Sequence, residues 1–539
     1  MNWPLRVSQE KVMAYELFDG QAGEPIDLWS LPSREQEEAL RKLLTPFSGK
    51  VFFKQAARRE LHISRALGEH QRLGELIFWA HAEALAIIWH EPLAFEEHFS
   101  RASTQTRLRD NAVQRYVVAL FEAAYARKAQ DIHIIHSGRS TLIRMRILGD
   151  LVDYEQKDAA FGEQMMALIY NCFAQQTGRA VFSHLLRLDG RIINPQVLPA
   201  GVFAARLHAE PIQTNARDAG LFMTLRLLYD ATEASGSLDE RLRHLGFLPE
   251  QIAQISLLLR RGGLSLVSGA TGHGKSTVLK HIFEAMVAAR PEQSYLSVED
   301  PPEYRILGVN QIQVHSAEGK SRAESYREAL AGALRSDPDV LMIGEIRYAE
   351  AAHAAITCAL SGHAVWATLH ADGALACVTR LEGLLEELGQ SRAREWILNP
   401  CVLSGLCHLR LLPVLCPDCK KRASEVLGRK RGTLDSEAEA SLLRAKKVFG
   451  RQFSKVCVRG QGCRFCQGRG TVAMTLAAEV VVLEENLREV LLQGQLALAR
   501  QMLKGQGSQT AWDVAREKML LGLVDPRDCE LRLYSQIPL

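Results

Sequence analysis

One segment of the chain combines the residue types that hold a polyphosphate. Residues 269–276 read GATGHGKS and fit the pattern G-x-x-x-x-G-K-[ST], between a short apolar stretch and a stretch with helical spacing of apolar residues. Its glycines let backbone N–H groups point inward, and these donors bind phosphate oxygens together with the positive end of a helix. We expect Lys275 to reach the β- and γ-phosphates and the Ser276 hydroxyl to ligate Mg²⁺. The other residues predicted to form this nucleotide-binding loop are Gly269, Thr271, Gly272, Gly274 and Thr277.

Acidic and imidazole side chains follow three further apolar segments that have the length of strands. These residues are Glu299 and Asp300 after 295–298, Glu345 after 340–343, and His370 after 365–369. In an open parallel sheet the carboxyl ends of the strands line one crevice, so we expect all of them near the phosphates. Carboxylates there hold a metal and activate water, and an imidazole senses the γ-phosphate. One such acid alone is as well explained as a turn residue, but the joint placement predicts an ATPase that uses ATP with Mg²⁺.

Two cysteine pairs have the spacing of metal ligands. Cys416 and Cys419 form one C-x₂-C pair, and Cys463 and Cys466 form another. Four thiolates in this arrangement suit a closed, tetrahedral Zn²⁺ site with a structural role. The intervening segment is longer than in a compact zinc ribbon, so buried or merely reduced thiols remain the alternative.

The order of elements that must position these residues indicates an α/β protein with several domains. A chain of 539 residues is too long for one core. Residues 1–108 are predicted to be mainly helical, and residues 109–232 alternate short strands and turns in an α+β pattern. From 233 to 539 strands and helices alternate, which favours a parallel sheet with helices on both faces. The cysteine pairs mark a metal-binding subdomain at 412–470 within that region.

Composition limits the partners and the compartment. The net charge of +3 gives no support to a nucleic-acid partner, so none is expected. No apolar run reaches the ~20 residues that span a bilayer; the nearest, 76–95, is interrupted by charged residues and is predicted to be a core helix. Eleven cysteines without an export signal indicate reduced thiols and a cytoplasmic protein.

In combination, these motifs resemble the secretion ATPase superfamily of type II secretion and type IV pilus systems. The family's boxes occur in order, as the loop at 269–276, an acidic box at 298–304, a degenerate Walker B box at 334–347 and a histidine box at 361–370. His273 stands where the family usually has serine. The resemblance covers about residues 110–480 and implies a RecA-like P-loop NTPase domain, a smaller α+β domain before it and an inserted tetracysteine zinc subdomain.

The resemblance also implies roles for individual residues. Glu345 corresponds to the Walker B acid that holds or polarises the catalytic water, and Glu299 and Asp300 correspond to acids that act at the metal. His363 and His370 correspond to residues that couple nucleotide state to conformation. Arginines of the smaller domain are expected to complete the site; the candidates are Arg206 and Arg217, with Arg144 and Arg146 behind them.

At the level of assembly, the resemblance implies a homohexamer on the cytoplasmic face of the inner membrane. Such a ring associates with the membrane peripherally, through a membrane-embedded platform protein. The string CPDCK at 416–420 is typical of assembly ATPases, which carry the tetracysteine subdomain. Two other functions stay open: a DNA-moving ATPase of a conjugation or secretion system, and a nucleotide-gated scaffold that hydrolyses little ATP.

Overall fold

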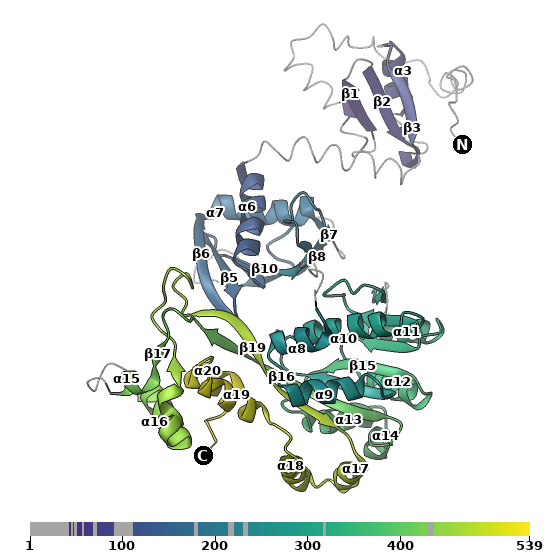
Figure 1. The fold of residues 1–539 in the computed structure, drawn as a ribbon. Coiled ribbons are helices and arrows are strands. Elements are labelled where there is room, and N and C mark those ends of the chain that lie inside the picture. Colours follow the sequence, from purple (N-terminus) through teal and green to yellow (C-terminus); the bar gives the residue numbers. More distant parts are fainter. Residues whose placement is uncertain are drawn as a thin grey trace. The chain divides into compact units, whose positions relative to one another are not determined.

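The computed structural model describes most of the chain. The described residues are 43–44, 47, 51–55, 59–67, 73–82, 84–90, 112–176, 182–213, 220–229, 236–315, 320–428 and 436–538. They divide into two compact units, Met1–Leu120 and Phe121–Leu539, which we describe separately (Figure 1). Arg217 lies outside the described residues, as does the expected domain division near residue 232.

The first unit contains a small mixed sheet. Its described elements are β1 (Val51–Gln55), β2 (Arg59–Ser64), η3 (Arg65–Leu67), α3 (Leu73–Ala82) and β3 (Ala86–His90). β2 pairs antiparallel with β1 and parallel with β3, and buried Leu61, Ile63 and Trp79 belong to the core of the unit. This sheet differs from the mainly helical region expected from the sequence. The helix predicted at 76–95 ends at Ala82, because the β-branched residues that follow favour a strand.

The second unit begins with an antiparallel sheet in the order β6-β5-β4-β10-β9-β8-β7. The elements of this N-terminal sheet region are β4 (Asp131–His136), β5 (Ser140–Ile147), β6 (Asp150–Asp158), α7 (Ala159–Leu168), η5 (Ile169–Phe173), β7 (Ala174–Gln176), β8 (Leu188–Ile192), β9 (Val202–Ile212) and β10 (Gly220–Tyr229). The helix before them, α6 (Ala112–Ala126), contains the division between the two units. Buried and half-buried residues alternate along β5, as in a sheet whose two faces differ. Leu148 and Gly149 both have positive φ and close a two-residue hairpin between β5 and β6.

The packing of α7 against β5 depends on a glycine, which yields a test of the fold. A Cβ at Gly162 would lie 1.7 Å from Oγ1 of Thr141. We therefore expect Gly162→Ala to destabilise the protein by about 1–3 kcal/mol, because the added methyl group forces the helix away from the sheet. Gly332→Ala is the control: this site in a helix has no atom within 4 Å of an added Cβ, so the variant should be neutral or slightly stabilising. Calorimetric melting of both variants checks this, and equal midpoints would contradict the packing.

The second sheet of this unit has the order β13-β12-β14-β15-β11-β16-β19 and is parallel except for β19. Its elements are α8 (Leu238–Leu245), α9 (Pro249–Leu258), β11 (Gly263–Ser268), α10 (Lys275–Ala289), β12 (Tyr295–Glu299), β13 (Asn310–Gln313), α11 (Arg322–Leu334), β14 (Val340–Ile343), α12 (Ala349–Leu360), β15 (Ala364–Leu369), α13 (Ala376–Glu386), α14 (Ala393–Ile397), β16 (Leu403–Leu415), β19 (Thr471–Val482), α17 (Glu485–Leu492) and α18 (Leu496–Gly505). Capping boxes at Ser237 and Ser321 fix where α8 and α11 begin.

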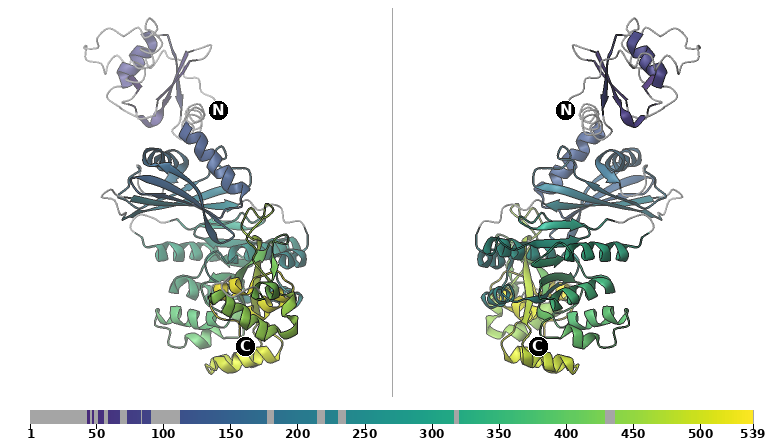
Figure 2. Two further views of the ribbon diagram at one scale, coloured as in Figure 1. Left: turned by 90° about the vertical axis from the view of Figure 1, so that its left-hand side faces the viewer. Right: turned by 90° about the vertical axis from the view of Figure 1, so that its right-hand side faces the viewer.

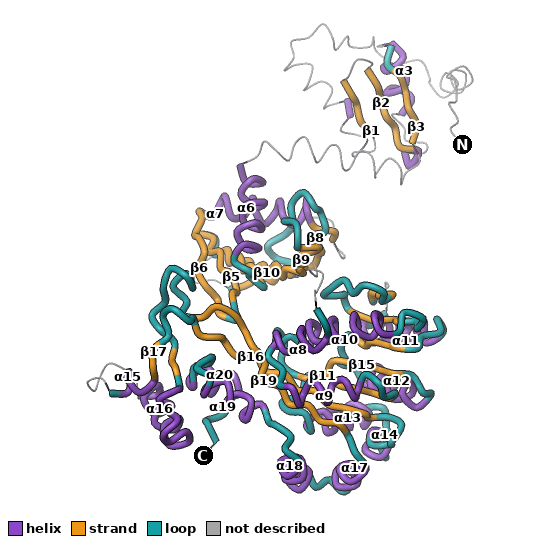
Figure 3. The backbone as a smooth tube through the Cα atoms, in the orientation of Figure 1, coloured by secondary structure: helices purple, strands orange, loops and turns teal. Residues whose placement is uncertain are grey.

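Helices cover both faces of this sheet, and the strands show why. Every residue of β11 is buried, as expected for a strand with no solvent face. Along β14, Leu341 and Ile343 pack with residues of α11, α12 and α13, whereas Val340 and Met342 pack with residues of α8, α9 and α10. Strands and helices alternate along this part of the chain (Figure 3). The α/β fold with a parallel sheet that the sequence predicts is therefore confirmed.

A group of small elements packs against the part of β16 and β19 that contains Leu412 and Ala477. It comprises β17 (Lys421–Arg422), α15 (Ala423–Leu427), α16 (Ser436–Phe449), η6 (Gly450–Lys455), β18 (Cys457–Val458), α19 (Ala511–Leu520) and α20 (Pro526–Leu533). Its own apolar core includes Leu442, Val514 and Met519. In both views of Figure 2 the green and yellow segments lie next to each other. The elements come from both sides of β19 in sequence, so the cysteine-bearing segment and the C-terminal helices form one packed group.

Candidate functional site

The predicted loop lies between β11 and α10, and its glycines are needed for distinct reasons. A Cβ at Gly269, where φ is +145°, would lie 2.6 Å from the carbonyl oxygen of Leu409 on β16. Gly272 and Gly274 have positive φ in open space, so they are required by backbone conformation alone. The loop ends where α10 begins at Lys275, which places free backbone N–H groups at the loop.

Lys275 lies at the centre of the loop and is mostly buried. Its ammonium group donates to the carbonyl oxygens of Gly269 at 2.8 Å and Ala270 at 3.2 Å. Burial lowers the pKa of Lys275, while the charges of Glu345 and Glu303 act in the opposite direction. A buried cation beside N–H donors is a strong attractor for phosphate oxygens.

The acids predicted at the strand ends are held by specific partners. Glu299, the last residue of β12, accepts hydrogen bonds from Ser297 at 2.7 Å and Gln311 at 2.9 Å, and burial raises its pKa. Asp300 pairs with Arg322 at the start of α11, with the Arg322 Nε 2.6 Å from an Asp300 oxygen. The two neighbouring acids are therefore in different states, one desolvated and one ion-paired.

Glu345 and His370 meet across two strands. An oxygen of Glu345 lies 2.8 Å from Nε2 of His370, and its other oxygen lies 2.5 Å from the guanidinium of Arg347. Burial lowers the pKa of His370, and the nearby Lys275 lowers it further, whereas Glu345 raises it. A carboxylate beside a largely neutral imidazole can accept a proton from water.

These groups line one cavity of about 550 Å³. Of the predicted residues, those that line it are Thr271, Gly272, Gly274, Lys275, Ser276, Thr277, Glu299, Asp300, Glu345, His370, Arg206 and Arg146. Gly269, Arg144 and His363 are not among the lining residues. The strand ends thus converge as the sequence predicts, which gathers N–H donors, cations and carboxylates, the groups that can bind a polyphosphate and a divalent cation.

His363 lies at the opposite end of β15 from His370. It precedes the strand, where its Nδ1 lies 3.0 Å from the Ser361 hydroxyl and 3.2 Å from the Cys358 carbonyl oxygen. The six residues of β15 separate the two histidines by about 20 Å. The structure therefore does not bring His363 to the cavity, in contrast to the expectation from the histidine box.

The arginines of the N-terminal sheet form a row on one face. Arg206, Arg226, Asp131 and Arg146 occupy directly opposite positions on β9, β10, β4 and β5, and directly opposed residues share a face. Asp131 is buried between two of them, 2.8 Å from Arg226 Nε and 3.6 Å from Arg146 Nε. The side chain of Arg206 makes no hydrogen bond or ion pair within the described residues. Partial burial lowers the pKa of Arg206, against the charge of Asp300.

Sequence reasoning missed some residues that line the cavity. They include Arg226, Arg347, Tyr304, Tyr326 and Arg532. The strand register would have pointed to Arg226, and Arg347 lies within the predicted Walker B box. Tyr304 contacts the loop, with its hydroxyl 3.1 Å from the hydroxyl of Thr277. Arg532 is distant in sequence from every motif, so no local signal marks it.

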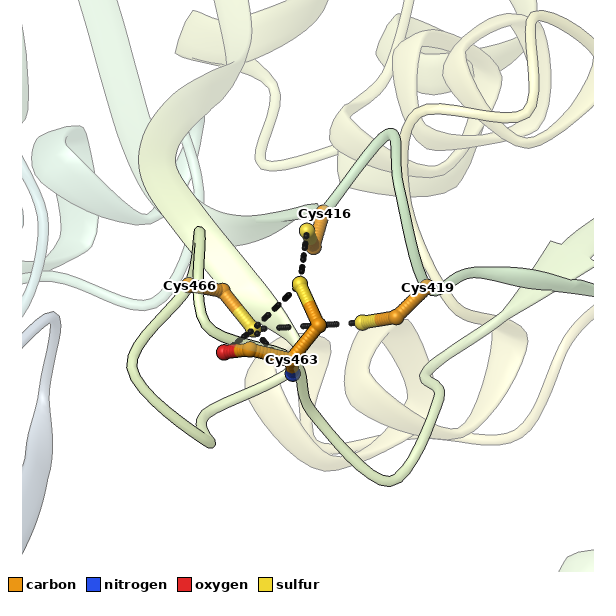
Figure 4. Close-up of side chains that lie close together, drawn as sticks. All are labelled: Cys416, Cys419, Cys463 and Cys466. Carbon is orange, nitrogen blue, oxygen red and sulfur yellow. Dashed lines mark hydrogen bonds between the residues drawn. The ribbon is translucent and has the colours of Figure 1, made fainter.

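The cysteines form a second site, separate from the cavity. The side chains of Cys416, Cys419, Cys463 and Cys466 lie close together (Figure 4), and their sulfurs are all within 4.8 Å of one another. The Cys416–Cys463 and Cys419–Cys466 sulfurs are 3.7 and 3.8 Å apart. Four sulfurs around a tetrahedral zinc ion with ~2.3 Å bonds are separated by about 3.8 Å, so the cluster fits such an ion.

Backbone N–H groups support the cysteine cluster. The sulfur of Cys466 accepts from the N–H groups of Cys463 and Gly470, both at 3.1 Å. Burial would raise the pKa of Cys466, but these donors outweigh it and lower the pKa to about 6. A thiol that is readily deprotonated is prepared to be a metal ligand.

Comparison with known proteins places the chain among secretion-system proteins. Residues 106–530 match the family described as "Type II/IV secretion system protein". The "Type IV pilus assembly ATPase PilB" of Thermus thermophilus is 27% identical over 77% of this chain and 42% of its own length, so the chain spans less than half of that relative. The "Type II secretion system protein E" of Dickeya dadantii is 29% identical over 77% of this chain and 74% of its own length.

Solved structures share the fold. The ATPase DotB of Legionella pneumophila superposes with a TM-score of 0.52 at 21% identity, over 76% of this chain and 93% of that chain. The DotB of Yersinia pseudotuberculosis gives 0.54 at 18% identity, over 79% and 94%. None of the helices in the described part of the chain combines the length and apolar character that a membrane span requires.

Proposed function

The chain belongs to the Type II/IV secretion system protein family, and from that premise we propose that it is a motor that hydrolyses ATP to assemble a type IV pilus or a type II secretion pseudopilus. The observation that carries this proposal is the convergence of Lys275, Glu299 and Glu345 on one cavity. The names of the Thermus and Dickeya relatives, a pilus assembly ATPase and a type II secretion protein, support the choice of machine.

In this mechanism the loop and Lys275 bind the phosphates. Ser276, Glu299 and Asp300 would hold a magnesium ion, which would neutralise charge on the phosphate oxygens. Glu345 orients the attacking water and accepts its proton. His370, which contacts the Glu345 carboxylate, senses whether the γ-phosphate is present. The water then displaces ADP from the terminal phosphorus, which leaves as inorganic phosphate.

The arginines of the N-terminal sheet would bind the nucleotide from the side opposite the phosphate-binding loop. Arg206 and Arg226 lie on the N-terminal sheet, whereas the loop that would bind the phosphates follows β11 of the parallel sheet, and both arginines line the cavity. Release of inorganic phosphate after hydrolysis removes its negative charge from the site and weakens that attraction, so the two sheets would separate after each turnover. We propose that 109–232 and 233–539 act as the two moving domains of a homohexamer.

The four-cysteine cluster favours an assembly motor over other members of the family. Cys416, Cys419, Cys463 and Cys466 fit zinc, and this subdomain is what the resemblance assigns to pilus assembly and type II secretion ATPases. The proposed partner is a platform protein of the inner membrane, and the proposed location is the cytoplasmic side of that membrane. A DNA-moving ATPase and a scaffold with little hydrolysis are the competing functions.

The proposal predicts Mg²⁺-dependent ATP turnover that rises with protein concentration. Sites completed by neighbouring subunits work only in the ring, so the specific activity should increase at least several-fold as the mass in solution approaches that of six chains. Turnover assays run beside light scattering check both. Turnover that needs DNA would favour the DNA-moving alternative, and an assembled ring without turnover would favour the scaffold.

A further inference from the structure

One flank of the cavity has no role in the chemistry proposed above. In the strand order β14-β15-β11-β16-β19, the strand β11 that precedes the loop has β15 and β14 on one side and β16 and β19 on the other. Glu345 and His370 lie on the β14 and β15 side. Leu411 of β16 and Met474 of β19 line the cavity on the other. A nucleotide whose terminal phosphate faces Glu345 must therefore extend its nucleoside toward β16 and β19.

The guanidinium of Arg532 on α20 also lines the cavity. Arg532 belongs to the last turn of that helix. Burial lowers the pKa of His273 in the loop, and the positive charge of Arg532 is one of the causes that lower it further. Arg532 packs against the hairpin turn, since a Cβ at Gly149 would lie 2.9 Å from its Nη2. Its Nε is buried and has no hydrogen-bond partner within the described residues. A buried donor without a partner at a ligand cavity is a candidate for contact with the ligand.

Asp150, the next residue of the hairpin, is shared by two arginines. Nη2 of Arg532 donates to one carboxylate oxygen at 3.2 Å, and Nη1 of Arg459 lies 3.5 Å from the other. Asp150 is half exposed, so these pairs contribute little to stability. We therefore interpret the contacts of Asp150 with Arg532 and Arg459 as fixing the position of the Arg532 side chain, because they add little to the stability of the fold.

Arg459 in turn stands on the cysteine-bearing segment. It directly follows β18, and its stem fills the space beside Gly470, where a Cβ would lie 2.7 Å from Cγ of Arg459. The next residue, Gly460, is pressed against Cys419, because a Cβ there would lie 1.9 Å from the Cys419 carbonyl oxygen. The second guanidinium nitrogen of Arg459 contacts Asp528 of α20 at 3.0 Å.

We propose that Arg532 is a nucleotide-binding residue that contacts the nucleoside side of the ligand, and that Asp150 and Arg459 position its guanidinium. This inference rests on the proposed function and adds a binding residue from the C-terminal helix. A planar guanidinium suits this place, since it donates to sugar or α-phosphate oxygens and stacks on a base. Because ADP and ATP share these parts, the contact serves both nucleotides equally.

The test is calorimetric titration of the full chain with Mg-ADP, and with Mg-ATP in a Glu345→Gln background. Arg532→Gln is expected to weaken both nucleotides about tenfold, as a lost charge-assisted hydrogen bond would. Arg532→Lys should recover only part of the loss, because it keeps the charge without the fork. Arg464→Gln, an exposed arginine of the cysteine segment, is the matched control and should bind as the wild type does.

A positioning role predicts non-additivity. Asp150→Asn and Arg459→Gln should each weaken ADP about threefold, and neither should weaken it further once Arg532→Gln is present. Unchanged affinity in Arg532→Gln, loss of ATP binding alone, or additive losses in the double variants would each overturn the assignment. A wild type that binds neither nucleotide would instead overturn the proposed function, and the assignment with it.

Discussion

Replacing Glu345 with glutamine is expected to lower the rate of ATP hydrolysis by at least about 100-fold while the affinity for ADP stays within about twofold. Glutamine has the same shape and can keep the contact with His370 that Glu345 makes at 2.8 Å. It cannot accept the proton of the attacking water, so the loss falls on the chemical step. Steady-state turnover with Mg-ATP and titration with Mg-ADP measure the two quantities separately.

The control for Glu345 is another carboxylate of the same region. Glu350 lies in the first turn of α12, five residues further along, and is not among the residues that line the cavity. Glu350→Gln should hydrolyse ATP at the wild-type rate. If Glu345→Gln kept full turnover, the water-activating role would move to Glu299, whose raised pKa makes it the next candidate.

The local sequence was sufficient to predict the site residues that lie at the ends of parallel strands. Glu299 and His370 directly follow an apolar run, and Glu345 follows one after Gly344. Parallel strands that end on one edge must bring such residues together. The loop at 269–276 was recognisable because its spacing is set by backbone geometry within eight residues. This part of the site is encoded by short-range order along the chain.

The remainder depends on contacts that no local pattern encodes. His363 and His370 share one box, and only the bounds of β15 show that they lie at opposite ends of it. Arg226 faces the cavity through the register of β10 with β9 and β4. Arg532 reaches the hairpin at Asp150 across 382 residues of sequence. Tertiary packing alone sets such distant pairs.

The N-terminal region shows a different limit. Residues 76–95 have apolar residues at helical spacing, yet the structure places 76–82 in α3 and 86–90 in β3. Short apolar runs fit both periods, and here Ile87 and Ile88, with Trp89, favour the strand. Pairing of β3 with β2 then settles the conformation, and that pairing is a property of the folded unit.

Replacing Cys466 with serine is expected to remove the bound metal and to destabilise the cysteine-bearing segment by several kcal/mol, on the order of the contribution of structural zinc. Cys466 is the most constrained of the four ligands, since it is buried and its sulfur accepts two backbone N–H groups. Metal analysis should find about one zinc per wild-type chain and markedly less in the variant. Hydrogen exchange should accelerate in 416–470 while β11 and β14 remain protected.

A nearby cysteine, Cys457, provides a control that distinguishes loss of the metal from a general loss of packing in the core. Cys457 is 3% exposed, and its sulfur lies 3.9 Å from a guanidinium nitrogen of Arg422, but it does not belong to the four-sulfur cluster. Cys457→Ser should therefore keep its zinc and lose only about 1–2 kcal/mol from the changed packing. Equal zinc content in the two variants would show that the cluster is not the metal site. Loss of zinc without faster exchange in 416–470 would show instead that the core formed by α16, α19 and α20 holds the segment by itself.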